Sequence, residues 1–218
     1  MENIVKKYLK DIIKKTPLNY FKRFLAWKRQ IDQLSEWENN GRLTPPPHIV
    51  KQRVLKQYAR KYNLKIFIET GTYYGDMVDA MKHIFDHIYS IELSNELFKR
   101  AKKRFKRIKN LDLIHGDSGE ELLGIIDKLT QPALFWLDGH FSAGETVKGK
   151  KETPIYEELL QILDAPDRGH IIIVDDARCF GKEPDYPTLE QLDDLIKSKR
   201  SNLDIFIEDD IIRITPKP

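Results

Sequence analysis

Cysteine is nearly absent from this sequence of 218 residues, in which Cys179 is the single one. No disulfide can form within such a chain, and this usage fits a reducing cytoplasm. No apolar stretch approaches the ~20 residues that a helix needs to cross a bilayer. The first residues also lack the long apolar segment and small-residue cleavage site of a secretory signal. We therefore expect a cytoplasmic protein with one large domain and a small appendage.

Internal repeats and low-complexity segments are missing too, but the charge is unevenly divided. Residues 1–30 hold nine Lys/Arg and two Asp/Glu, a balance of +7, so the remainder carries −4 of the net +3. Within residues 1–15, apolar residues recur at helical spacing between lysines, which predicts a basic amphipathic helix. Two roles remain open for it: peripheral contact with an acidic membrane surface, or packing on a partner or on its own domain.

Two further helices and a connector separate this segment from the rest of the chain. Apolar spacing predicts a second helix around residues 21–34 and a third over about 48–62. Between them, "TPPP" at 44–47 is a stiff connector. We therefore expect two domains, a basic helical extension over 1–47 and an α/β domain over 48–218.

After residue 64 the pattern changes to short apolar runs of strand length. The last two runs are separated only by Asp209 and Asp210, which is too short for a crossover helix, so they should pair antiparallel. The pattern predicts an α/β fold, a doubly wound Rossmann-like seven-stranded sheet with an antiparallel last strand. The expected strands cover 65–69, 87–92, 111–115, 133–138, 170–176, 203–208 and 211–215.

Helix starts can also be read from the sequence. Ser118 with Glu121, and Thr188 with Gln191, have the spacing of a capping box, so Ser118 and Thr188 are expected to cap helices. The basic stretch 98–110 keeps apolar residues along one side, which predicts a helix whose charges face solvent. Nucleic acid is therefore not expected as a partner.

Acidic residues follow nearly every expected strand. In doubly wound sheets the ligand binds beyond the carboxyl ends of the strands, so these acids should line a single binding edge. The strand endings are Glu69-Thr70-Gly71, Glu92, Asp117, Asp138-Gly139-His140 and Asp175-Asp176.

The first of these turns, "ETGTYYGD" (69–76), is poor in glycine for a dinucleotide site. It keeps Gly71 and Gly75 but lacks G-x-G-x-x-G, and Asp76 at the start of the next helix would repel a phosphate. A ligand without phosphates, such as S-adenosylmethionine (SAM), suits this loop. Glu92 is then placed to accept hydrogen bonds from ribose hydroxyls, and Asp117 to reach the adenine amino group.

Taken together, "FIETGTYYGD", "SIEL", "IHGDS", "WLDGH" and "IVDDA" resemble the ordered motifs of class I SAM-dependent methyltransferases over about residues 65–215. That family has a seven-stranded sheet with an antiparallel last strand. The resemblance implies that Glu69, Gly71 and Gly75 hold the methionine part of SAM. Thr70, Ser118 and Asp138 are counted with them as cofactor-binding residues.

Asp138, Asp175 and Asp176 also form a candidate metal site, because the two strands that carry them should be neighbours. Oxygen ligands select a hard ion such as Mg²⁺. Adjacent strand residues point to opposite faces, so Asp175 and Asp176 can share an ion only where the chain turns.

This arrangement resembles the metal-dependent small-molecule and sugar O-methyltransferases, which often carry Asp-Gly-Asp after strand four with the second Asp as base. His140 stands at that position here. Its unperturbed pKa near 6.5 suits it to remove a proton from an acceptor hydroxyl that a metal has acidified.

The preferred interpretation is a SAM-dependent O-methyltransferase that acts on a hydroxyl of a sugar, glycan or other small molecule. Two alternatives stay open: a metal-independent methyltransferase, and a non-catalytic domain tethered by its basic N-terminal helix. The long loop 139–152 is a candidate lid. Its residues Lys148, Lys150 and Lys151 could meet an acidic substrate, although lysines in exposed loops are usually solvated. Arg178, just past the aspartate pair, is a weaker candidate for the same task.

Overall fold

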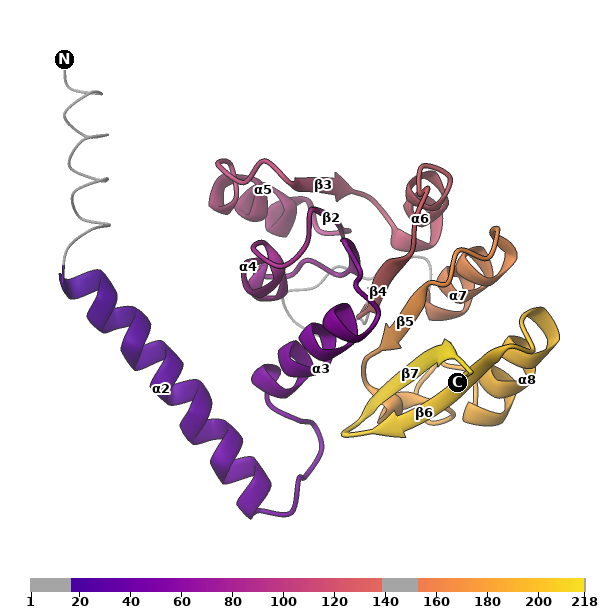
Figure 1. Ribbon diagram of the computed structural model, residues 1–218, viewed down its shortest axis with the longest axis horizontal. Coiled ribbons are helices and arrows are strands. Elements are labelled where there is room, and N and C mark those ends of the chain that lie inside the picture. The colour runs from indigo at the N-terminus through magenta and orange to yellow at the C-terminus, as the bar shows by residue number, and fades with distance from the viewer. Residues whose placement is uncertain (1–16, 139–152, 218) are drawn as a thin grey trace. The chain divides into compact units, whose positions relative to one another are not determined.

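The computed structural model describes residues 17–138 and 153–217 (Figure 1). The chain divides into two compact units, residues 1–50 and 51–218. The basic helix predicted over 1–15 lies outside the described residues. Among the helices that the structure does describe, none has the length and apolar character needed to cross a membrane.

The first unit contains helix α2 (Pro17–Asn39), which confirms the second predicted helix. It starts at a proline, a residue that the first helical turn tolerates because no backbone N–H is needed there. Near its end, Leu34 and Trp37 are buried together with Val50. The indole N–H of Trp37 donates to the carbonyl of Leu43 at 2.6 Å, so the chain after α2 folds back against the end of the helix.

The second unit is built on one seven-stranded sheet with the order β3-β2-β1-β4-β5-β7-β6. Strands β1 to β5 are parallel, and β7 lies between β5 and β6, antiparallel to both, as the short final connection predicts (Figure 1). The strands are β1 (Ile66–Thr70), β2 (His87–Glu92), β3 (Leu111–His115), β4 (Ala133–Leu137), β5 (Ile171–Val174), β6 (Leu203–Glu208) and β7 (Ile211–Pro216).

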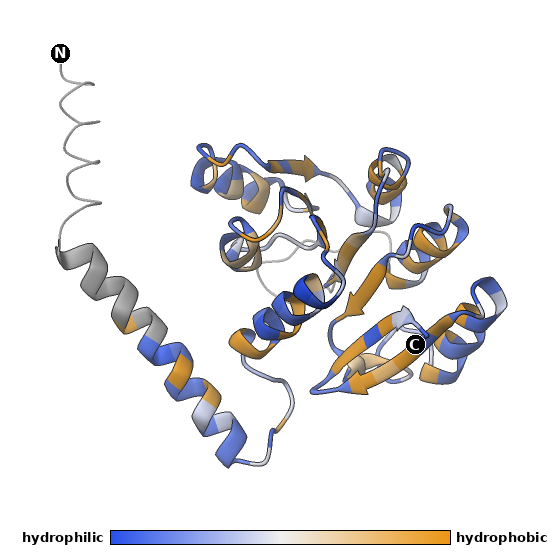
Figure 2. Cartoon of the chain, viewed as in Figure 1, coloured by the Kyte–Doolittle hydropathy of each residue, from blue (hydrophilic) through white to orange (hydrophobic). Residues whose placement is uncertain are grey.

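Helices cover both faces of this sheet, and the apolar sides of strands and helices meet (Figure 2). One face packs against the second-unit part of α3 and against α4, with α5 beside them. The other face packs against α6, α7 and α8. Since successive strand side chains point to opposite faces, β1 buries Phe67 on the first face and Ile68 on the second. The helices are α3 (His48–Lys61), α4 (Asp76–Met81), α5 (Asn95–Arg104), α6 (Ser118–Ile126), α7 (Ile155–Asp164) and α8 (Leu189–Lys199), with a short 3₁₀ turn η1 (Ala177–Cys179).

One of the two predicted caps is confirmed and the other is wrong. Thr188 and Gln191 form the expected capping box at the start of α8. At α6 the cap is Asp117, whose Oδ1 accepts from the backbone N of Gly119 at 3.0 Å, and Ser118 is the first helical residue. An aspartate caps as well as a serine and also places negative charge at the positive end of the helix dipole, so the upstream residue takes the position.

His170, just before β5, is a buried histidine at the sheet edge opposite the strand ends that carry the acids. Its side chain is only 3% exposed. Nδ1 accepts a hydrogen bond from the backbone N of Ala133 at 3.1 Å, and the ring meets Phe135 edge-on. Burial, together with the positive charges of Arg200 and Arg168, lowers its pKa to about 4. The imidazole is therefore neutral at physiological pH and serves as a hydrogen-bond acceptor.

This burial predicts a loss of stability in mild acid. The pKa of His170 rises to about 6.5 on unfolding, so the unfolded state binds more protons between the two values. Stability contributed by the neutral ring is therefore lost as the pH falls from about 6.5 toward 4, and we expect about 2 kcal/mol to be lost between about pH 7.5 and 5.

Urea unfolding at both pH values measures this effect. The amide oxygen of His170→Asn replaces the Nδ1 acceptor but does not titrate. The change in the free energy of unfolding between the two pH values should therefore be smaller in this variant by about 2 kcal/mol. His83→Asn is the matched control and should keep the full change. An unchanged pH dependence in His170→Asn would contradict the assignment.

Candidate functional site

Glu69, the fourth residue of β1, places a buried carboxylate at the edge where the parallel strands end. Its side chain is fully buried, and Ser90 Oγ of β2 donates to Oε1 at 2.6 Å. Among the described residues, Oε2 has no hydrogen-bond partner. Burial raises the pKa of Glu69 to about 8, more than the Ser90 hydrogen bond lowers it. A buried acid with an unused oxygen is suited to meet a positively charged ligand group.

The turn after β1 is held in a left-handed backbone conformation at its glycines. Gly71 has φ +95° and Gly75 has φ +80°, a region that glycine adopts without strain. Backbone N–H groups of Gly71 and Thr72 both donate to the carbonyl of Ile91, which fixes the turn against β2. Gly75 precedes α4 and packs against Phe105, since a Cβ there would lie 2.8 Å from Phe105 Cζ. Both glycines of the first motif therefore have a structural reason to be glycine.

Glu92, at the end of β2, ties this turn to the next one. Its carboxylate accepts from the backbone N of Tyr73 at 2.7 Å and from that of Ser94 at 2.8 Å. Glu92, which is predicted to bind ribose hydroxyls, thus holds the turn after β1 and the turn after β2 in place. Nearby, Asp76 is paired with Arg104 at 2.7 Å, so its charge is compensated and repels a phosphate less than the sequence implied.

Glu158 is a third buried glutamate at this edge, after Glu69 and Glu92, and was not predicted. It lies in the first turn of α7 and is fully buried beside the hydroxyl groups of Thr70 and Ser118. Burial raises its pKa to about 7. The available signal was the apolar spacing of Ile155, Leu159 and Ile162, which places Glu158 on the buried side of its helix.

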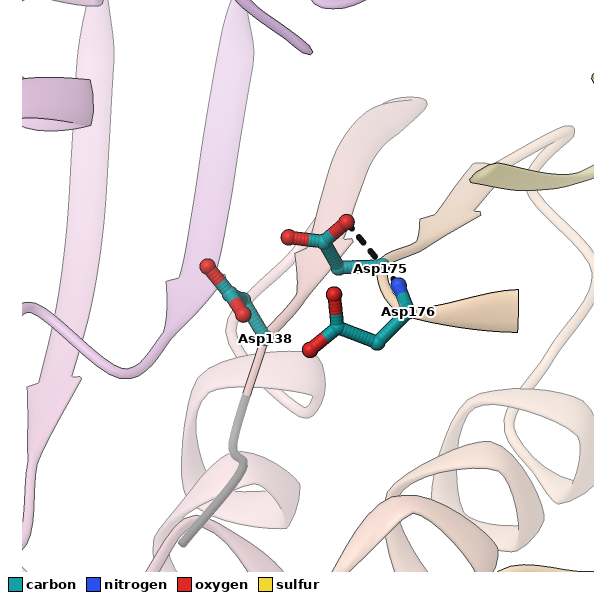
Figure 3. Close-up of side chains that lie close together, drawn as sticks. All are labelled: Asp138, Asp175 and Asp176. Atoms are coloured by element: carbon teal, nitrogen blue, oxygen red, sulfur yellow. Dashed lines mark hydrogen bonds between the residues drawn. The ribbon is translucent and has the colours of Figure 1, made fainter. Parts of the chain in front are cut away.

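Asp138, Asp175 and Asp176 converge at the ends of β4 and β5, with ligand oxygens within 4.8 Å of one another (Figure 3). The two strands pair directly, Leu137 opposite Val174, so the residues that follow are neighbours. Asp176 has φ +56° and ψ +46°, which means that the chain turns immediately after β5. This turn lets two consecutive aspartates face one region, the condition that a shared ion requires.

Two basic side chains also reach this cluster of three aspartates. Lys51 of α3 forms an ion pair with Asp175 Oδ2 and lies 3.9 Å from Asp176 Oδ1. Arg178 Nη1 lies 2.7 Å from Asp176 Oδ1 and is also paired with Asp210. The structure thus places Arg178 on two acids of its own chain, so its charge is already compensated, and a role toward an acidic substrate stays a prediction.

Asp210 connects the C-terminal hairpin to the same region. It lies in the two-residue turn between β6 and β7, and its Oδ1 accepts from the backbone N of Arg178 at 2.7 Å. Its carbonyl accepts from the backbone N of Ala177 at 2.9 Å. The segment that follows Asp176 is therefore held by three contacts from this turn.

The electrostatics of the cluster favour a cation. Burial and the neighbouring Asp175 carboxylate raise the pKa of Asp138 well above its usual range. Burial raises the pKa of Asp175 to about 6, although the Lys51 ammonium opposes the rise. Crowded carboxylates of this kind gain from an added positive charge, and a donor set made only of oxygens fits a hard divalent ion such as Mg²⁺.

The two loops of the site are close at the backbone level. The backbone N of Asp138 lies 3.2 Å from the carbonyl and 3.3 Å from the hydroxyl of Thr70. The aspartate cluster and the glycine turn after β1 therefore begin at adjacent strand ends. The predicted base His140, the candidate lid 139–152 and the three lysines within it lie outside the described residues.

Comparison with solved structures identifies the fold. An O-methyltransferase from Bacillus cereus in complex with SAH is 13% identical, with 98% of this chain and 97% of that one covered and a TM-score of 0.57. The O-methyltransferase TomG from Streptomyces achromogenes, in complex with SAM, is 14% identical, with 87% and 89% covered and a TM-score of 0.57. The SAH-bound Podospora anserina methyltransferase PaMTH1 is 17% identical, with 93% of this chain and 97% of that one covered and a TM-score of 0.55.

No protein-family model matches the sequence, and neither does any curated protein. The likeness is one of structure, at low identity, and it confirms the resemblance indicated by the sequence motifs at the level of the fold. The second unit of this chain has the fold of the class I SAM-dependent methyltransferases.

Proposed function

We propose that this protein is a SAM-dependent O-methyltransferase that acts on a hydroxyl of a sugar, glycan or other small molecule with the help of a divalent metal ion. The observation that carries the proposal is the convergence of three aspartates at the sheet edge beside the glycine turn. Solved structures with this fold hold SAM or SAH. If the glycine turn after β1 binds SAM and the three aspartates bind a divalent ion, the site can bring a methyl donor and an acceptor hydroxyl together.

The cofactor half of the site is assigned to the ends of β1, β2, β3 and β4. Glu69, whose buried Oε2 has no hydrogen bond from the residues that the structure describes, faces the positively charged methionine part, and the turn from Thr70 to Gly75 lets the backbone approach it. Glu92 takes the ribose. Asp117 and Ser118, at the start of α6, lie beside the adenine, and the backbone of Asp138 completes the edge.

The acceptor half of the site is assigned to the three aspartates and His140. Asp138, Asp175 and Asp176 would hold the Mg²⁺ ion, which when bound supplies positive charge that makes an acceptor hydroxyl more acidic. His140 takes the hydroxyl proton. The acceptor oxygen then forms a bond to the methyl carbon while the carbon–sulfur bond breaks, leaving a methyl ether and S-adenosylhomocysteine.

Calorimetric titration with SAM, with and without Mg²⁺, tests this assignment. We expect SAM to bind and Mg²⁺ to change its binding or that of an acceptor. SAM binding without any effect of metal would favour the metal-independent alternative. Absence of SAM binding would favour the non-catalytic domain. Screening of sugar nucleotides and glycans for methyl transfer then identifies the acceptor.

Glu69 should make SAM binding dependent on pH. Because its pKa is about 8 in the free protein, the carboxyl is mostly protonated at neutral pH, and a cationic ligand selects the carboxylate. Binding therefore releases a proton, and affinity should rise severalfold from about pH 6.5 to 7.5. Glu69→Gln should bind SAM about tenfold more weakly at the upper pH, because a charge-assisted contact is worth about 1.5–3 kcal/mol.

The control for this measurement is Glu96→Gln, a change at the start of α5 outside the cofactor motifs. Both variants experience the same titration of SAM itself, so the difference between them isolates Glu69. Equal affinities and equal pH profiles for Glu69→Gln and the unmodified protein would remove Glu69 from the cofactor site.

A further inference from the structure

Lys51 brings a positive charge of the protein into the aspartate cluster from a distant part of the sequence. It lies in α3 and is the first residue of the second unit. Its side chain is 15% exposed, against 1% for Asp175 and 9% for Asp176. The ammonium is therefore largely removed from solvent, and it faces the two aspartates that follow β5.

Most of the carboxylate oxygens of the Asp175–Asp176 pair already have partners. Oδ2 of Asp175 pairs with Lys51, and Oδ1 accepts from the backbone N of Asp176 at 2.9 Å. Oδ1 of Asp176 pairs with Arg178 at 2.7 Å. A divalent ion that binds here must share or take oxygens that the lysine contacts, and the two cations repel each other strongly at such distances.

We propose that Lys51 is a tethered cation that competes with a divalent metal ion for Asp175 and Asp176, so that the lysine side chain leaves the cluster when the ion binds. This inference rests on the metal site of the proposed function and concerns how its occupancy is controlled. The three aspartates have a compensating charge in the metal-free protein, and metal binding is weakened by the need to displace it.

Manganese binding measures the competition directly. Mn²⁺ is titrated into the intact protein, Lys51→Met and Lys56→Met, with free Mn²⁺ followed by electron paramagnetic resonance. Methionine keeps the aliphatic chain and removes the charge, and Lys56 lies on the same helix without an ion pair to the cluster. We expect Lys51→Met to bind Mn²⁺ about tenfold more tightly, which is about 1.4 kcal/mol, and Lys56→Met to match the intact protein. Equal or weaker binding by Lys51→Met would overturn the proposal.

The displacement of the Lys51 side chain is tested on the unmodified protein, so the result does not depend on whether a variant folds. Brief acetylation with and without saturating Mn²⁺ is quantified at each lysine by mass spectrometry. Release of Lys51 predicts increased acetylation at Lys51 upon Mn²⁺ binding, with Lys56 unchanged. Unchanged or decreased modification of Lys51 would show that the lysine stays in place and would overturn the proposal.

SAM binding measured on the same samples separates this inference from the wider function. Competition at the aspartates with no SAM binding would support the role of Lys51 while rejecting the methyltransferase assignment. If SAM binds but Mn²⁺ binds to none of the proteins, the proposed competition between Lys51 and a metal ion is wrong, and the metal-independent methyltransferase is favoured.

Discussion

Replacing His140 with alanine is expected to lower methyl transfer by about 10²–10⁴-fold, the usual contribution of a positioned base. SAM binding should stay unchanged, because Asp138 contributes to the cofactor half through its backbone, which the alanine leaves in place, and the other residues assigned to the cofactor lie at the ends of β1, β2 and β3. His140 follows Asp138 by two residues, which is the sequence position of the base in the metal-dependent O-methyltransferases that the motifs resemble. Turnover is measured as transfer of a labelled methyl group, and SAM affinity by calorimetry.

His83→Ala provides the matched control, since it removes an imidazole between α4 and β2, away from the aspartate cluster. Its turnover should equal that of the unmodified protein. Undiminished turnover in His140→Ala would exclude this residue as the base. A joint loss of turnover and SAM binding would indicate damage to the cofactor site instead of loss of a proton acceptor.

Gly75→Ala is expected to lower the free energy of unfolding by about 2–4 kcal/mol. The backbone conformation at φ +80° costs an alanine about 1 kcal/mol. The added methyl group also meets the ring of Phe105, at 2.8 Å from Cζ before any shift, and overpacking of this kind costs about 1–3 kcal/mol more. Urea unfolding measures the sum, and SAM affinity should fall with it because Gly75 ends the cofactor turn.

Gly169→Ala separates the two contributions. Gly169 has a similar φ of +74°, but a Cβ there would meet nothing within 4 Å, so only the backbone cost of about 1 kcal/mol applies. Adding Phe105→Leu to Gly75→Ala should recover part of the difference by relieving the contact. If Gly75→Ala and Gly169→Ala cost the same, the packing of Phe105 does not restrict this turn.

The sheet was predictable because all seven strands read as short runs rich in apolar residues, and the central strands β1, β4 and β5 are buried along their whole length. β2, β3 and β6 have the predicted bounds. β5 is shorter than the predicted 170–176, since His170 uses its ring to accept from β4 and the chain turns at Asp175 and Asp176. A run of residues indicates a strand, but its ends depend on hydrogen bonds that the sequence pattern does not contain.

The aspartate cluster was also predictable, since neighbouring parallel strands bring their carboxyl ends together. Lys51 was not, because its partner Asp175 is 124 residues away and a lysine on a predicted helix usually faces solvent. The pairing of Arg178 was not predictable for a similar reason, because its partner Asp210 lies in the hairpin turn, 32 residues away. Sequence patterns thus located the acids, whereas the basic groups that compensate them depend on tertiary contacts.

The contacts of Asp210 with Ala177 and Arg178 have a consequence for the order in which the site is assembled. Strands β1 to β5 are synthesised first and can pair in parallel, but the segment after Asp176 lacks its support until the β6–β7 hairpin has left the ribosome. A nascent chain, or one trimmed before β6, would lack the contacts of Asp210 that hold the segment after Asp176. The support for the segment that follows the proposed metal ligand Asp176 is therefore synthesised after the first five strands of the sheet.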